Sequence, residues 1–171
     1  SGPTKTVTLE SCVVIGYTTQ NRATMIAVNA SSTLIMNGCS MINLGTGTLS
    51  YGVKCVAGPG SAYVTMNSCY IDGPYQFIFS RNGASGTGAY HHCGFYNAGG
   101  VVTVNDRSYP FTNGGNNIGD GSGTSQLVGV AHIESMDYET ALRPIESSLL
   151  IDAGDPTLDG TLDLFGVVRA T

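Results

Sequence analysis

Apolar and polar residues alternate in short runs that recur along most of the chain. Four runs share one form: an apolar–x–apolar segment, two corner residues, a cysteine and, two positions later, another apolar residue. They align on Cys12, Cys39, Cys69 and Cys93, which are 27, 30 and 24 residues apart. A period of this length is short for helical repeats and is typical of a β-solenoid whose coil has three short strands and three corners.

The alternation also predicts which side chains face the interior, because neighbouring residues of a strand point to opposite sides. Three interior columns are expected: Val7, Leu34, Val64 and Gly88; Leu9, Met36, Met66 and Tyr90; and Val14, Met41, Ile71 and Phe95. Another strand recurs at residues 26–28, 53–55 and 77–79 and continues at 102–104, with Cys55 in line with Val28 and Phe79. Stacked coils bury a continuous core, so the sequence predicts an all-β fold of about four coils of roughly 27 residues with parallel strands.

The cysteine column and the corner before it have a structural interpretation. The chain has five cysteines, and an odd count argues against a fully paired disulfide framework. Neighbouring coils hold Cβ atoms at the strand spacing, which is too long for a relaxed disulfide, and a straight column cannot converge tetrahedrally on a metal ion. We therefore expect these cysteines to act as small buried hydrophobic residues. Asn37 and Asn67 are expected to stack as a hydrogen-bonded asparagine ladder.

The pattern changes after Thr112. Residues 113–123 are rich in Gly, Asn and Asp and predict a loop, and residues 134–142 predict one short helix or helical turn that Pro144 prevents from extending. The chain then contains I-D-A-G-D-P at 151–156 and D-G-x-x-D-x-x-G-x-x-R at 159–169.

This tail resembles the closing segment of many bacterial and phage right-handed parallel β-helix proteins. The corner at His91 and His92, and residues 164 and 165, depart from the small or polar residues usual there. The resemblance implies a right-handed parallel β-helix with coils in residues 1–112, and with an irregular C-terminal cap and final coil in residues 113–171 of the same domain.

A cap is expected on physical grounds, because a solenoid otherwise ends in an apolar cross-section with unpaired strand edges. Within it we expect structural roles for Asp152, Asp155 and Asp163, with Arg169 pairing with one of them; calcium binding is the alternative for these carboxylates. No cofactor is otherwise expected. Strand-like sequence begins at Val7 without a cap, so we expect that end to be covered by copies of the chain, an upstream domain or another subunit.

Charge and candidate chemistry narrow the function. The formal net charge of −5 disfavours nucleic-acid binding, and no run of 18 apolar residues is present to insert into a membrane. The candidates for acid–base chemistry are Asp72, His91 and His92, but no paired carboxylates of the kind a glycosidase needs are evident, and exposed corner imidazoles are the alternative for the histidines. The candidates for stacking on sugar rings or anchoring a protein contact are Tyr51, Tyr70, Tyr75 and Tyr96, with scattered amphipathic cover as the alternative.

These features favour a non-catalytic structural or adhesive module of an extracellular, cell-surface or virion assembly, of the tail-spike, fibre or capsid-decoration type. The resemblance also leaves open a fragment of a polysaccharide lyase or glycoside hydrolase, or a carbohydrate-binding module.

Overall fold

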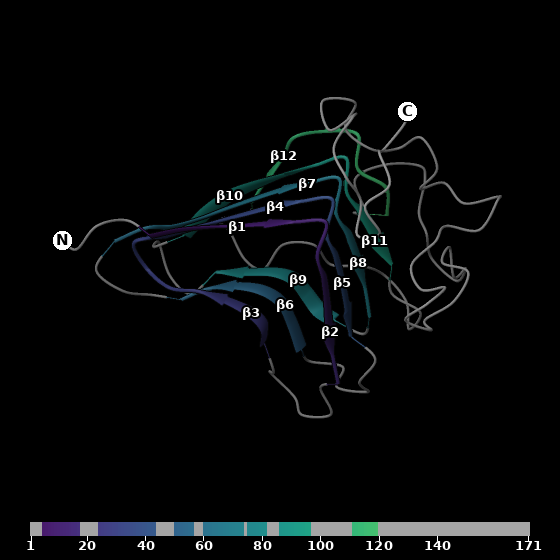
Figure 1. The fold of residues 1–171 in the computed structure, drawn as a ribbon, viewed down its shortest axis with the longest axis horizontal. Coiled ribbons are helices and arrows are strands. Elements are labelled where there is room, and N and C mark those ends of the chain that lie inside the picture. Colours follow the sequence, from purple (N-terminus) through teal and green to yellow (C-terminus); the bar gives the residue numbers. More distant parts are fainter. Residues whose placement is uncertain are drawn as a thin grey trace.

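The computed structural model describes residues 5–17, 24–43, 50–56, 60–73, 75–81, 86–96 and 111–119, with the side chains of residues 50 and 75–81 excepted. Within these residues the fold is all-β, and each strand pair is parallel (Figure 1). The predicted helix at 134–142, the strand at 102–104 and the cap residues Asp152, Asp155, Asp163 and Arg169 lie outside the described residues.

The strands form three sheets that surround a shared interior (Figure 1). The first contains β1 (Lys5–Glu10), β4 (Ser32–Asn37), β7 (Ala62–Asn67), β10 (Gly86–His91) and β12 (Thr112–Asn113). The second contains β2 (Val13–Gly16), β5 (Ser40–Asn43), β8 (Tyr70–Asp72) and β11 (Gly94–Tyr96). The third contains β3 (Thr24–Val28), β6 (Ser50–Cys55) and β9 (Tyr75–Arg81). Each of the first three repeats therefore adds one strand to each sheet, and we call the strands of one repeat a rung.

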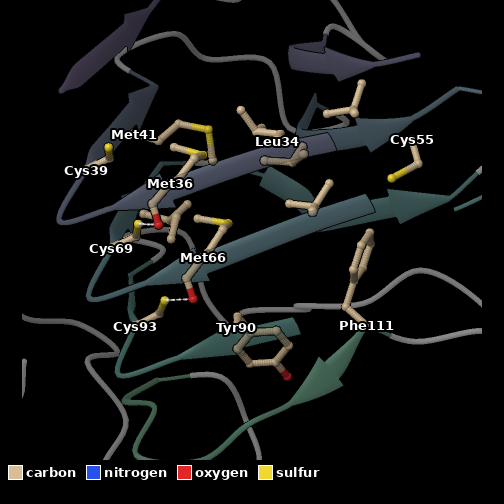
Figure 2. Close-up of a cluster of buried hydrophobic side chains, with 14 of the residues drawn as sticks. Leu34, Met36, Cys39, Met41, Cys55, Met66, Cys69, Tyr90, Cys93 and Phe111 are labelled. Atoms are coloured by element: carbon tan, nitrogen blue, oxygen red, sulfur yellow. Dashed lines mark hydrogen bonds between the residues drawn. The ribbon is translucent and has the colours of Figure 1, made fainter. Parts of the chain in front are cut away.

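The predicted columns of the first sheet are confirmed. Val7 pairs with Leu34, Leu34 with Val64, and Val64 with Gly88, without a register shift. Leu34 and Val64 are buried, whereas Tyr63, their neighbour on the other face, is exposed. The interior of these rungs forms one cluster of apolar side chains, part of which Figure 2 shows.

A left-handed residue precedes each cysteine of the column. Ser11, Gly38, Ser68 and His92 have φ angles of 51°, 57°, 49° and 50°. This conformation reverses the alternation at the corner, which lets the apolar residue before the corner and the cysteine after it both face inward. Since only one of the four residues is glycine, composition gives no signal for this feature.

The predicted register of the third sheet is wrong for its last strand. Val28 pairs with Cys55 as expected, but Cys55 pairs with Arg81, and Phe79 pairs with Val53. The register also shifts at residues 50 and 51, as a β-bulge does. A slip of two residues leaves the same residues on the same face, so alternation could not detect it.

The loop prediction for residues 113–123 is also wrong in part. Asn113 belongs to β12, and Ile118 forms a parallel bridge with Gly94, so a fifth rung begins here. Phe111 is buried in the core cluster at the position opposite Gly88. A Cβ at Gly88 would overlap the Phe111 ring and the carbonyl oxygen of Val64, so a side chain there could not coexist with the aromatic residue below it.

Candidate functional site

The first rung, made by β1, β2 and β3, is an open end of the described structure. These strands occupy the terminal position in their three sheets, so among the described residues no strand lies beyond them. Each of them therefore presents one backbone edge that no other described strand pairs with in its sheet. Unpaired edges of this kind are templates for pairing with another chain.

Side chains of the first rung are also incompletely covered. Val7 is 54% exposed, although Leu34 and Val64 in its column are 5% and 1% exposed. Ile15 and Tyr17 are exposed as well, so of the four exposed large hydrophobic residues described, all but Tyr63 belong to this part of the chain. The hydrophobic residues that pack against the core cluster but are only partly buried are likewise from the first rung, namely Leu9, Cys12, Val14, Met25 and Ile26. Among the described residues, an apolar cross-section thus coincides with three strand edges that have no neighbouring strand.

A polar cluster lies on the outer face of the second sheet. The hydroxyl of Tyr70 donates a hydrogen bond of 3.1 Å to Oδ2 of Asp72, and Tyr96 lies beside Asp72 in the paired strand. Burial raises the pKa of Asp72 to about 6, an effect that the hydrogen bond from Tyr70 partly opposes. Burial also raises the pKa of Tyr96, with the charge of Asp72 adding to it. The three side chains form a compact polar cluster in a partly dehydrated setting.

Asp72 does not acquire a catalytic partner within the described residues. The candidate histidines lie at the corner where β11 begins, whereas Asp72 pairs with Tyr96 where β11 ends. At about 3.3 Å per residue, the path along the strand from His92 to Tyr96 is roughly 13 Å. The structure therefore does not bring Asp72 and the two histidines together, and Asp72 is left with tyrosines as its described polar neighbours.

The histidine corner is packed against the fifth rung. A Cβ at Gly114 would overlap the imidazole of His91, which shows that this ring lies over the glycine. Nε2 of His92 is 2.8 Å from Nδ2 of Asn116. Both histidines are partly buried, so they are not the exposed corner imidazoles that were considered as the alternative to acid–base chemistry. Their contacts hold successive corners together.

The four candidate tyrosines are not one exposed surface. Tyr70 and Tyr96 are 8% and 7% exposed and pack together with Ile118 nearby, so neither offers an open face to a sugar ring. Tyr51 belongs to the third sheet, where the ammonium of Lys54 lies 5.1 Å from the centre of its ring. The side chain of Tyr75 lies outside the described residues. The sequence did not single out Tyr17, which is 73% exposed, because nothing in its immediate pattern distinguishes it.

The asparagine and cysteine positions form ladders along the stack. Nδ2 of Asn67 donates a hydrogen bond of 2.9 Å to Oδ1 of Asn37. Cys39, Cys69 and Cys93 are buried and Cys12 is partly buried; all four are free thiols. In the fifth rung Asn117 takes the place of the cysteine: it accepts a bond of 2.8 Å from the Cys93 amide and donates to the Tyr90 carbonyl.

Among the described residues no group of three or more His, Cys, Asp or Glu side chains is arranged to hold a metal ion. That part of the chain likewise has no helix long and apolar enough to cross a membrane. No family model, curated protein or solved structure matches the chain.

Proposed function

We propose that the chain is a right-handed parallel β-helix that serves as a non-catalytic structural or adhesive module in an extracellular, cell-surface or virion assembly. The single observation that carries this proposal is the open first rung, where exposed apolar side chains coincide with unpaired strand edges. The closing motif at residues 151–169 supports the same proposal by resemblance.

In this proposal the first rung is the docking surface, and a further layer of β-structure covers it. Copies of the chain are the occupant we favour. The unpaired strand edge of one copy can pair with that of another, and the exposed apolar side chains of the two copies can pack together. A neighbouring domain or a different subunit would satisfy the same requirements. The outer face of the first sheet, where Tyr63 is exposed, is left free to contact other molecules.

Native mass measured over a range of protein concentrations tests the docking surface. We expect the wild-type chain to associate and Val7→Asp to remain monomeric, because the substitution places a charge in the apolar cross-section. Tyr63→Asp is the matched control: Tyr63 is 47% exposed on the outer face of β7, away from the free edge, and its substitution should leave the mass unchanged. Equal masses for the wild type and Val7→Asp would contradict docking through this surface.

Polysaccharide processing is the second candidate, and Asp72 is the observation that favours it. A carboxyl whose pKa is raised to about 6 can donate a proton near neutral pH, as a general acid must. Chain cleavage or elimination in acidic polysaccharides that disappears in Asp72→Asn would support this function. Binding to glycans without turnover would instead support a carbohydrate-binding module.

A further inference from the structure

The cysteine column brings thiols from successive rungs into register. Backbone bonds of 2.9 Å join the Ser40 amide to the Cys12 carbonyl and the Tyr70 amide to the Cys39 carbonyl, so the cysteines themselves lie one rung apart. Figure 2 shows Cys39, Cys69 and Cys93 one beneath another along one side of the core, with Cys55 on the opposite side. Residues paired in register on neighbouring strands are about 4.8 Å apart.

Each thiol lies between its own rung and the preceding one. Sγ of Cys39 is 3.3 Å from the carbonyl oxygen of Leu9 and 3.4 Å from that of Asn37. Sγ of Cys69 is likewise 3.5 Å from that of Met36 and 3.3 Å from that of Asn67. The sulfur of Cys39 therefore lies on the side of its rung that faces the rung carrying Cys12. Cys12 is only partly buried, so this end of the column is accessible in the monomeric chain, whereas Cys69 and Cys93 are 2% and 1% exposed.

The distance between successive rungs decides whether two thiols of the column can form a disulfide, a tetrahedral metal site or a linear metal site. In-register Cβ atoms held at about 4.8 Å are farther apart than the roughly 3.5–4.5 Å of a relaxed disulfide, and a straight column cannot provide the tetrahedral ligands of zinc. A metal–thiolate bond is about 2.3 Å, so two such bonds in a line span roughly 4.6 Å, which is close to the rung spacing. Linear coordination by two sulfur atoms is the preference of soft d10 ions.

We propose that Cys12 and Cys39 form a linear two-coordinate site for a soft d10 metal ion, and that the site favours Hg(II). Both thiols release their protons to solvent as the two sulfur–metal bonds form, and no oxidation or reduction is involved. The preference for a divalent ion follows from charge. Hg(II) with two thiolates is neutral, whereas Ag(I) or Cu(I) with two thiolates carries a negative charge, and the core cluster around Cys39 is made of apolar side chains and thiols.

The site is tested by titrating the reduced full-length chain with HgCl2 in a fixed excess of a monothiol competitor, and following sulfur-to-mercury absorption and the mass of the complex. We expect one ion per chain at this site, and binding weaker by more than about tenfold in Cys12→Ser, because the second bond is no longer intramolecular. Cys55→Ser is the matched control, since Cys55 is a buried free thiol in another sheet and should not affect binding. Wild-type affinity in Cys12→Ser would overturn the proposal.

X-ray absorption of the mercury complex of the wild-type chain gives a readout that does not depend on a variant folding. Two sulfur neighbours at about 2.3 Å in a linear arrangement are expected, and three or four sulfur neighbours would overturn the site. Ag(I) in the same competition should bind more weakly than Hg(II). Equal or tighter binding of Ag(I) would overturn the charge argument for selectivity.

Discussion

Val64→Ala and Val7→Ala remove the same atoms from one column of the first sheet, but from rungs that differ in coverage. Val64 is 1% exposed in the third rung and Val7 is 54% exposed in the first. At about 0.8 kcal/mol for each buried carbon removed, plus a cavity term, Val64→Ala should lower the free energy of unfolding by about 2–3 kcal/mol. Val7→Ala should cost less than about 1 kcal/mol, because half of its surface already contacts water and no closed cavity forms.

Thermal unfolding of the dilute, monomeric chain measures this difference. For a chain of this size, 1 kcal/mol corresponds to roughly 2–4 °C in Tm, so Val64→Ala should lower Tm by roughly 4–12 °C and Val7→Ala by no more than roughly 4 °C. At concentrations where the chain associates, Val7→Ala should become more costly while Val64→Ala does not change. Equal costs in the monomer would refute the reasoning, because they would mean that the first rung is as well covered as the third.

Three further predictions concern the ladders, the corners and the outer cluster. Asn67→Ala removes the 2.9 Å bond to Asn37 and should lower the free energy of unfolding in urea by about 1 kcal/mol, whereas no loss would mean that water replaces the ladder. Gly38→Ala, at a φ of 57°, should cost about 1–2 kcal/mol in the same assay, since a Cβ is disfavoured in this conformation; a neutral effect would show that the corner relaxes. Asp72 has a pKa raised from 3.8 to about 6, so the folded state binds its proton more tightly, and the stability present below pH 4 is lost as pH rises through 6, by at most about 3 kcal/mol. Asp72→Asn should remove this part of the pH dependence in urea unfolding between pH 4 and 7, and an unchanged profile would contradict the assigned pKa.

The columns of the first sheet were predictable because two patterns agree: alternation shows which residues face inward, and the repeated cysteine aligns those residues from one coil to the next. Val7, Leu34 and Val64 pair as their positions before the cysteines predict. Alternation has a period of two residues, however, so it could not fix the pairing of Cys55 with Arg81 rather than Phe79.

A final coil is expected within residues 113–171, but the position of the fifth rung escaped prediction because no cysteine marks it. Asn117 stands where the other rungs have cysteine, in a segment whose Gly and Asn content suggested a loop. A signal was available, since Asn117 follows Cys93 by 24 residues and Cys93 follows Cys69 by the same interval. Tyr70 and Tyr96 were misjudged for a different reason: they lie on an outer face, and a strand pattern shows which face a residue is on without showing what covers that face.

Amide hydrogen exchange of β1, compared between the assembled wild-type chain and Val7→Asp, tests the central claim most directly. If the first rung is the docking surface, the amides of β1 should exchange more slowly in the assembly than in the variant, while those of β7 are protected alike in both. Equal exchange of the β1 amides in the two samples, with slower amide exchange in the assembly only for strands outside the first rung, would contradict an assembly built through the first rung.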